Sequence, residues 1–284
     1  MAEQPQDLGS WIGRTETLND LVTETPVRGL RALLDIDDKA IADLALLPPA
    51  WHWMFFAPIA RQSEIGADGH PRRGGFLPPV ALPRRMWAGS ELQFHRPIRV
   101  GDSLARTSRI ADVREKAGRT GPLVFVTVNH ELSVDGALAI SERQDIVYRE
   151  MPQADEPAPA SVAAPADAQW TRRIVPDPVM LFRYSALTFN GHRIHYDRSY
   201  ATSVEHYPGL VVHGPLIATL LLDLLRRELP DATVTHFKFR AVKPLIDTQS
   251  FHVCGRMEDA ETVKLWAKNE NGDLTMDAVA MVAR

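Results

Sequence analysis

The chain of 284 residues is long enough for one large domain or two domains of ordinary size. Its hydrophobic content of 45% and charged content of 24% are typical of a globular protein that buries a core. The formal net charge of -4 shows no excess of basic residues, which argues against nucleic acid as the main partner. The single cysteine, Cys254, excludes an intramolecular disulfide and a zinc site built on cysteines.

The N-terminal residues, MAEQPQDLGSW, lack the charged and apolar segments of a secretory signal. The longest apolar run, GLVVHGPLIATLLLDLL, is interrupted by His213 and Asp223 and is too short to span a membrane. We therefore expect no membrane partner and a cytoplasmic location. The single cysteine fits such a reducing compartment.

In the first half, Thr25 and Pro26 predict the start of a helix over VRGLRALLDI, with Thr25 as the N-cap and Pro26 at the first helical position. The segment WHWMFF, at 51–56, is expected to be helical and part of the core. Further on, GPLVFVTVNHELSVDGALAISERQDIVYRE alternates with a period of two around the turn VDGA, which is typical of an antiparallel hairpin. The first half is therefore predicted to end in a meander of three or four strands.

Residues 151–168, MPQADEPAPASVAAPADA, contain four prolines and seven alanines. Such a segment buries too little apolar surface to offset the entropy lost on ordering, so it is interpreted as a linker. It separates an N-terminal unit, 1–150, from a C-terminal unit, 169–284.

In the second half, Gly214 and Pro215 predict the start of a helix over LIATLLLDLLRREL, and Arg226 and Arg227 suit its C-terminal end. Its leucines point in nearly all directions, so we expect the helix to be wrapped by a sheet. Alternating runs joined by ENGD follow and predict a second meander. A long apolar helix wrapped by a curved antiparallel meander is a hot-dog unit. Two such units in one chain predict an α+β double hot-dog fold.

Four of the ten histidines lie between His192 and His213, in and after the segment ALTFNGHRIHYD. Within it, Asn190 precedes His192, and Asp197 follows His195. Imidazoles, whose ordinary pKa is about 6.5, are suited to proton transfer at neutral pH. The segment is therefore predicted to be an acid–base and water-holding strip. His206 is expected to be a core residue without a role in chemistry.

The sequence resembles the MaoC-like family of (R)-specific enoyl-CoA hydratases and β-hydroxyacyl thioester dehydratases. It is most similar to the two-unit branch with mesaconyl-CoA and itaconyl-CoA hydratases and mitochondrial-type dehydratases. The family motif Gly-Asp-x-Asn-Pro-Leu-His-x-Asp falls on FNGHRIHYD, with His195 on its histidine and Asp197 on its last aspartate. The segment PGLVVHGPLIA, at 208–218, resembles the Ala-His-Gly start of the family's central helix. WIGRTET and PRRGGFLPPVALPRRMWAGSELQFHRP resemble the first half of the two-unit branch.

The resemblance implies a hydro-lyase that adds water to, or removes it from, an α,β-unsaturated or 3-hydroxyacyl-CoA thioester. A short branched dicarboxylic thioester, such as mesaconyl-CoA or itaconyl-CoA, is the implied substrate. No cofactor is expected beyond the CoA thioester itself. The second half is expected to be catalytic. The first half is expected to be a degenerate copy that shapes the acyl and CoA tunnel.

The chain departs from the family motif at two positions, because the family's catalytic aspartate falls on Asn190 and its asparagine on His192. An amide cannot accept a proton at neutral pH, so the proton-transfer roles must be assigned to residues differently from those of the family. We predict that His195 is the base, that Asn190 holds the water, and that His192 shares the proton transfer or orients the water. The backbone N–H of Gly214, at the positive end of its helix, is expected to stabilise the enolate. Asp197 is expected to play a supporting role or to cap the next turn.

A dicarboxylic acyl chain needs a cationic partner, and arginine binds a carboxylate with two hydrogen bonds. His213 is expected to contact the substrate or to anchor the start of the helix. The arginine pair in PRRGG also suits the CoA phosphates, with a solvated loop as the alternative. The candidate arginines are Arg72, Arg73, Arg183, Arg193 and Arg198.

Several alternatives remain open in the sequence. The same fold can act on an acyl-carrier protein as a dehydratase of fatty acid synthesis, or it can be a non-catalytic acyl-CoA binding module. His192 and His195 have the spacing of half a metal site, but no third ligand is clearly signalled, and we expect no metal. The oligomeric state is left open, with a homo-oligomer as one alternative.

Overall fold

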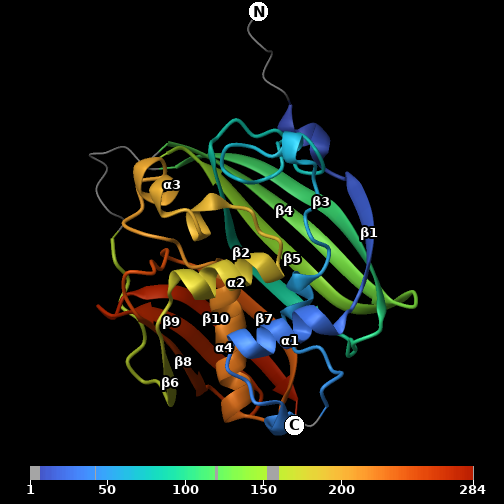
Figure 1. Cartoon of the computed structure of the whole chain (residues 1–284), viewed down its shortest axis with the longest axis vertical. Helices are drawn as coiled ribbons and strands as arrows, with labels where there is room; N and C mark the ends of the chain where they lie inside the picture. The colour runs from blue at the N-terminus through green and yellow to red at the C-terminus, as the bar shows by residue number, and fades with distance from the viewer. Residues whose placement is uncertain (1–6, 42, 119–120, 152–159, 284) are drawn as a thin grey trace, which may run out of the picture.

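The computed structural model describes residues 7–41, 43–118, 121–151 and 160–283. Within these ranges, ten strands form one antiparallel sheet with the order β1-β3-β4-β5-β2-β7-β10-β9-β8-β6 (Figure 1). The strands are β1 (Thr15–Leu21), β2 (Arg84–Phe94), β3 (Ser103–Gly118), β4 (Gly121–Val134), β5 (Ala137–Arg149), β6 (Trp170–Ile174), β7 (Thr233–Ala241), β8 (Phe251–Met257), β9 (Thr262–Asn269) and β10 (Leu274–Ala283).

The sheet consists of two halves with the same internal order. Read inward from its two edges, it runs β1, β3, β4, β5, β2 on one side and β6, β8, β9, β10, β7 on the other. The two halves meet where Gly89–Gln93 of β2 pairs antiparallel with His236–Arg240 of β7. This repeat fits the predicted α+β double hot-dog fold.

Both predicted meanders are present, as β3-β4-β5 and β8-β9-β10. The turn between β4 and β5 has positive φ at Asp135 (50°) and Gly136 (78°), as an Asp-Gly hairpin turn requires. The turn between β9 and β10 has its positive φ at Gly272 (83°). The VDGA and ENGD segments are therefore hairpin turns, as their sequences predicted.

Helix α4 (Gly214–Glu228) begins at the predicted residue, and all side chains of 216–225 are buried. It packs against β6, β8, β9 and β10, which explains why its apolar residues point in all directions. The buried carboxylate in this helix, Asp223, binds Arg172, Arg226 and Arg227 at 2.6 to 2.8 Å, so its charge is compensated.

The N-terminal half has a shorter helix, α1 (Glu24–Leu33). Its N-cap is Thr23, two residues before the predicted Thr25, and Pro26 lies in the first turn, where its missing N–H leaves no helical bond unmade. Helix α1 packs against α2 (Pro178–Leu187), and α3 (Arg198–Ser203) follows. The segment Trp51–Met54 forms a buried 3-10 helix, as expected. No helix of the described ranges is long and apolar enough to cross a membrane.

Of the predicted linker, 152–159 lie outside the described residues. Its last part runs along the turn between β9 and β10. The Val162 carbonyl accepts from the Leu274 N–H at 2.7 Å, and the Ala164 N–H donates to the Gly272 carbonyl at 2.9 Å. This part of the segment is therefore attached to the C-terminal half.

Candidate active site

The loop after α2 is held in shape by Asn190. Its backbone N–H donates to the Ser185 carbonyl at 2.8 Å, and its Oδ1 accepts from the backbone N–H of His192 at 3.0 Å. The side-chain oxygen is thus used in a local turn, as is common for asparagine. Phe189 just before it has a φ of 49°, a left-handed conformation, at the position where the family motif has glycine. The amide nitrogen of Asn190 and the second lone pair of its Oδ1 are left to bind a water.

His195 lies in the 3-10 helix Arg193–His195 and is 8% exposed. Its Nδ1 donates to the Val211 carbonyl at 2.7 Å, which leaves a lone pair on Nε2. Burial, together with His213 and His192, lowers the pKa of His195 well below its usual range. The expectation of an ordinary pKa was therefore wrong. His195 is neutral at pH 7, with Nε2 free to accept a proton.

His213 packs against His195. Its ring stacks on the His195 ring with centroids 3.7 Å apart, and its Nε2 bonds to Ser185 Oγ at 2.8 Å. Burial and the charge of His192 lower the pKa of His213 to about 3. Because His213 is only 1% exposed, this geometry favours the predicted role as an anchor over direct contact with a substrate.

The start of α4 follows directly after His213. The first intrahelical bond runs from the Ile217 N–H to the His213 carbonyl at 3.1 Å. The N–H groups of Gly214 and Leu216 precede it, and Pro215 has none, so the helix end presents free donors. A Cβ placed on Gly214 would meet no atom within 4 Å, so the space beside this residue is open. The helix start therefore has the properties of the predicted enolate-stabilising group.

A loop of the N-terminal half crosses the histidine segment. The Arg193 N–H donates to the Asp68 carbonyl at 2.9 Å, and Arg193 Nη1 donates to the Ala67 carbonyl at 3.0 Å. At the crossing, Gly69 has a φ of 89°, and a Cβ there would lie 1.8 Å from the Gly191 carbonyl oxygen. Only glycine permits this close approach of the two backbones.

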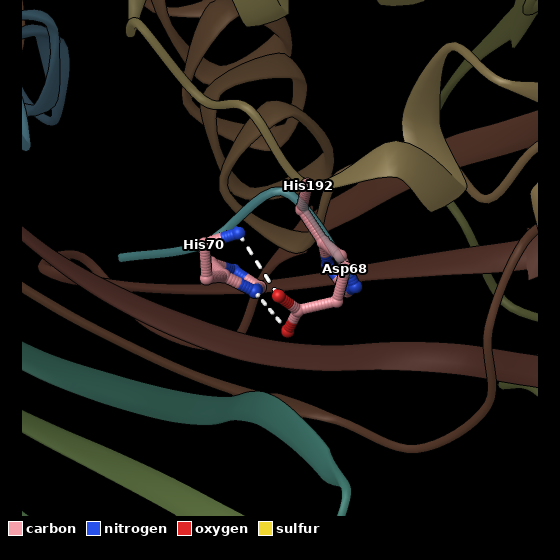
Figure 2. A group of neighbouring side chains, drawn as sticks. All are labelled: Asp68, His70 and His192. Atoms are coloured by element: carbon pink, nitrogen blue, oxygen red, sulfur yellow. Dashed lines mark hydrogen bonds and ion pairs between the residues drawn. The ribbon is translucent and has the colours of Figure 1, made fainter. Parts of the chain in front are cut away.

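The crossing places Asp68 and His70 beside His192 (Figure 2). Asp68 Oδ2 accepts from His70 Nδ1 at 2.9 Å, and its Oδ1 accepts from the His70 backbone N–H at 3.0 Å. The His70 and His192 rings have centroids 4.1 Å apart, and His192 meets His195 edge-on at 5.4 Å. Three imidazoles and a carboxylate are therefore in continuous contact.

The pKa values of Asp68 and His70 are both lowered, but burial acts on them in opposite directions. Burial raises the pKa of Asp68, but the bonds from His70 outweigh it and hold the pKa below its usual range. Burial lowers the pKa of His70 to about 4, although the bond to Asp68 opposes this. Asp68 is therefore ionised and His70 neutral at pH 7.

Glu205 also lies close to His192, with Oε1 4.0 Å from Nε2 of the ring. Its second oxygen forms a buried ion pair with Arg84 of β2 at 3.2 Å. This pair is a further link between the two halves. A cavity of about 20 Å³, lined among others by Asp68, His192 and Glu205, has room for a single water.

Asp68, His70 and His192 are also the group of described residues whose side chains could meet at a metal, with ligand atoms within 4.8 Å of one another. The His70 and His192 rings have centroids 4.1 Å apart and an interplanar angle of 39°. The bond between Asp68 and His70 also satisfies both groups without a metal. The expectation that the site uses no metal stays a prediction.

Comparison with known proteins identifies the family. Residues 50–247 match the family described as hydroxyacyl-thioester dehydratase type 2. The chain belongs to this family. It is 46% identical over 96% of both chains to mesaconyl-C(4)-CoA hydratase of Chloroflexus aurantiacus. It is 28% identical, over 94% of this chain and 96% of the other, to the mitochondrial hydroxyacyl-thioester dehydratase type 2 of Schizosaccharomyces pombe.

The chain is similar in structure to a solved Mycobacterium tuberculosis protein with a double hot-dog fold. The two structures align over 96% of both chains, with a TM-score of 0.60 and 15% identity. The predicted fold is confirmed by this likeness. As a member of the dehydratase family with a hydratase as a relative, the chain is an enzyme of the hydratase and dehydratase class.

Several residues predicted from the family motif have structural partners here. Asp197 caps α3 by accepting from the Tyr200 N–H at 3.0 Å, and it binds the Arg193 guanidinium at 2.7 Å. The predicted capping role of Asp197 is thus present, and Arg193 is held by its neighbours rather than left for a substrate. Arg73 donates to the carbonyl groups of Val80, Leu82 and Pro83.

The remaining candidates lie at the surface. Arg72 and Arg183 are exposed, and Arg198 binds the buried Asp247 at 2.5 Å. The predicted core position of His206 was wrong, because this residue is exposed and has a φ of 58°, and its lack of a role in the chemistry stays a prediction. The assignment of Arg72 to substrate binding stays a prediction.

Sequence reasoning missed the contribution of Asp68, His70 and Glu205. A local signal exists for the first two, because Asp-Gly in GADGH predicts a turn and Asp-x-His places a carboxylate next to an imidazole. Nothing in the sequence places this turn against a segment more than 120 positions away. Only the crossing at Gly69 and Gly191 does so.

Proposed function

We propose that this enzyme adds water to, or removes it from, the double bond of an α,β-unsaturated CoA thioester. A short branched dicarboxylic thioester such as mesaconyl-CoA is the proposed substrate. The observation that carries the proposal is the buried His195, which has a lone pair on Nε2 and whose ring stacks on His213, the N-cap residue at the open start of α4. The relation to mesaconyl-C(4)-CoA hydratase supports the choice of substrate.

The reaction needs a proton acceptor and a stabiliser for the enolate. As the water oxygen bonds to the β-carbon, one water proton moves to Nε2 of His195, and the double-bond electrons pass to the thioester oxygen. The N–H groups of Gly214 and Leu216 stabilise the negative charge on that oxygen. The α-carbon then takes a proton from the His195 imidazolium, which restores the neutral ring.

His192 and Asn190 supply positioning in this proposal. The amide nitrogen of Asn190 can donate to the water oxygen, because its Oδ1 is already bound to the His192 N–H. Nothing in the step requires a cofactor beyond the CoA thioester. The cytoplasmic location and the oligomeric state stay predictions.

The experiment that tests the proposal follows the loss of enoyl thioester absorbance. Mesaconyl-, itaconyl-, crotonyl- and longer enoyl-CoA are compared at equal concentration. We expect mesaconyl-CoA or itaconyl-CoA to have the highest kcat/KM. Absence of hydration with every thioester would contradict the proposal and favour a non-catalytic acyl-CoA binding module.

A second candidate is dehydration of a 3-hydroxyacyl group on an acyl-carrier protein, which the match to the dehydratase family favours. The two candidates differ in how they recognise the carrier. An enzyme that binds CoA directly should lose affinity when the 3′-phosphate is removed. An enzyme that docks a carrier protein should process 3′-dephospho-CoA thioesters as well as the parent compounds.

A further inference from the structure

We propose that the N-terminal half supplies a second hydrogen-bond acceptor for the attacking water in the active site. In this proposal His70, oriented by Asp68, takes the place of the carboxylate that position 190 lacks. This inference rests on the proposed hydration reaction. It gives the first half a direct part in the chemistry, beyond shaping a tunnel.

The need for such a group follows from the attacking water. A water that attacks carbon is held best when both of its hydrogens point to acceptors, which leaves its oxygen lone pair free for the β-carbon. His195 Nε2 is one acceptor. The side-chain oxygen of Asn190 is a weaker acceptor than the carboxylate of the family motif, and one of its two lone pairs already accepts from the His192 N–H at 3.0 Å.

The Asp68–His70 pair has the geometry of an oriented base. A carboxylate that accepts from Nδ1–H fixes the imidazole in the tautomer with a lone pair on Nε2. Here the 2.9 Å bond to Oδ2 does this, while the backbone N–H of His70 holds the other carboxylate oxygen. Both oxygens of Asp68 are therefore fixed, and His70 needs no rearrangement to accept a hydrogen bond at Nε2.

The surroundings of the Asp68–His70 pair also suit a group that contacts the reacting water. The His70 ring contacts His192, which in turn contacts His195, so the three rings line one continuous strip. The side chains of His70 and Asp68 are 18% and 29% exposed, so solvent and substrate can reach them.

The proposed step balances without a further reactant. The water oxygen bonds to the β-carbon, one of its protons moves to Nε2 of His195, and its other hydrogen is hydrogen-bonded to Nε2 of His70. The α-carbon then receives a proton from His195, which returns to its neutral state, and His70 stays neutral throughout. His70 contacts the reacting water in this step, and Asp68 acts through His70 as a positioning residue.

Asp68→Asn and His70→Gln test the proposal. An asparagine at position 68 keeps one oxygen for the His70 backbone N–H, but its NH₂ group would face Nδ1 and reverse the tautomer of the ring. A misplacement of the reacting group by about 1 Å can cost about 10²-fold, so we expect kcat to fall by about 10²-fold in both variants when the attacking water is no longer oriented. We expect KM for mesaconyl-CoA and the melting temperature to change little.

The matched control is His236→Gln. His236 also bonds to a carboxylate across the junction of the two halves, with Nε2 3.1 Å from Glu91 Oε1, but it lies on β7 away from the histidine segment. We expect its kcat to stay within twofold of the wild type. Nitrogen-15 NMR of the histidines adds a measurement independent of turnover, since Asp68→Asn should convert His70 from the Nδ1–H to the Nε2–H tautomer.

The outcomes separate the two proposals. If the wild type is active and both variants match His236→Gln, the role of His70 is refuted while the hydratase assignment stands. If KM rises and kcat is unchanged, the loop only binds substrate, and the inference is also refuted. If the wild type hydrates no thioester, the proposed function fails and the inference with it.

Discussion

The two halves of the sheet share a strand order but enclose different interiors. In the C-terminal half, α4 is buried over ten consecutive residues and packs against apolar strands. In the N-terminal half, α1 has four buried residues and packs against α2. Both halves bury a carboxylate, but Asp223 of α4 is bound by arginines, whereas Glu142 of the N-terminal half accepts from His52, Trp53 and Ser90 at 3.2, 3.1 and 2.7 Å.

In the proposed site, equivalent segments of one fold contribute in unlike ways. In each half, the candidate site residues lie between the first and second strands of that half. The C-terminal half uses this connection for α4 and the histidine segment. The N-terminal half uses it for the loop with Asp68 and His70, which reaches across to the other half.

The largest effect is expected in the C-terminal half. His195→Ala should lower turnover by about 10² to 10⁴-fold, because it removes the principal base. The fold should survive, as judged by circular dichroism. His206→Ala is the control and should leave turnover unchanged, since His206 is exposed. Near-normal turnover of His195→Ala would show that the motif has been assigned wrongly.

The next effect depends on the substrate. Asn190→Asp keeps the oxygen that accepts from His192 but adds a negative charge. If the distal carboxylate of a dicarboxylic substrate lies about 4 Å away, the two charges repel by about 4 kcal/mol at an effective dielectric constant of 20. We expect kcat/KM on mesaconyl-CoA to fall by about 10³-fold, and crotonyl-CoA to be tolerated or hydrated faster. Equal losses on both would make Asn190 a geometric residue only.

A third prediction tests whether turnover requires the contact between the two halves at Gly69 and Gly191. Gly69→Ala should push the N-terminal loop off Gly191, because the new Cβ would lie 1.8 Å from its carbonyl oxygen. A displacement of about 1 Å can cost about 10²-fold in turnover, and we expect a loss of that size. Gly74→Ala is the matched control. It has the same positive φ of 90°, but its nearest contact is Pro79 of its own loop at 3.7 Å. Equal activity of the two variants would argue that the crossing is dispensable.

The buried histidines predict a pH dependence of stability. The pKa of His213 is lowered from 6.5 to about 3, so the unfolded chain binds a proton between these values and the folded chain does not. The free energy of unfolding should therefore fall as the pH falls. His213 alone should account for about 2 kcal/mol between pH 7 and pH 5. Urea unfolding at both pH values measures this, and His213→Gln should show a smaller difference. A difference as large as that of the wild type would contradict the assignment.

The smallest effect is expected from chelation. Enolate stabilisation by the start of α4 needs no Lewis acid, so prolonged treatment with a chelator should leave turnover unchanged. Activity is measured before and after, together with the metal content. Stoichiometric zinc, with activity lost on removal and restored on return, would instead assign Asp68, His70 and His192 as ligands.

Most of the fold could be predicted because it depends on local patterns in the sequence. The turns at Asp135 and Gly272, the start of α4 and the repeated meanders each depend on a few neighbouring residues. His195 could be predicted because a linear motif includes it. The lowered pKa values of His195 and His213 could not, because they result from burial. The roles of Asp68 and Glu205 were missed because they arise from contacts between segments distant in the chain.

The pairing of β2 with β7 joins two equivalent units within one polypeptide. In a symmetric pair of separate identical chains, every substitution would appear twice, once in each of two equivalent sites. A single continuous chain removes this constraint, so each copy is free to change independently. One copy can then keep the histidines while the other provides a supporting loop. The loss of a carboxylate at position 190 becomes tolerable once a residue from the other copy can replace it. Asymmetry is thus a benefit of covalent fusion that an assembly of identical subunits does not have.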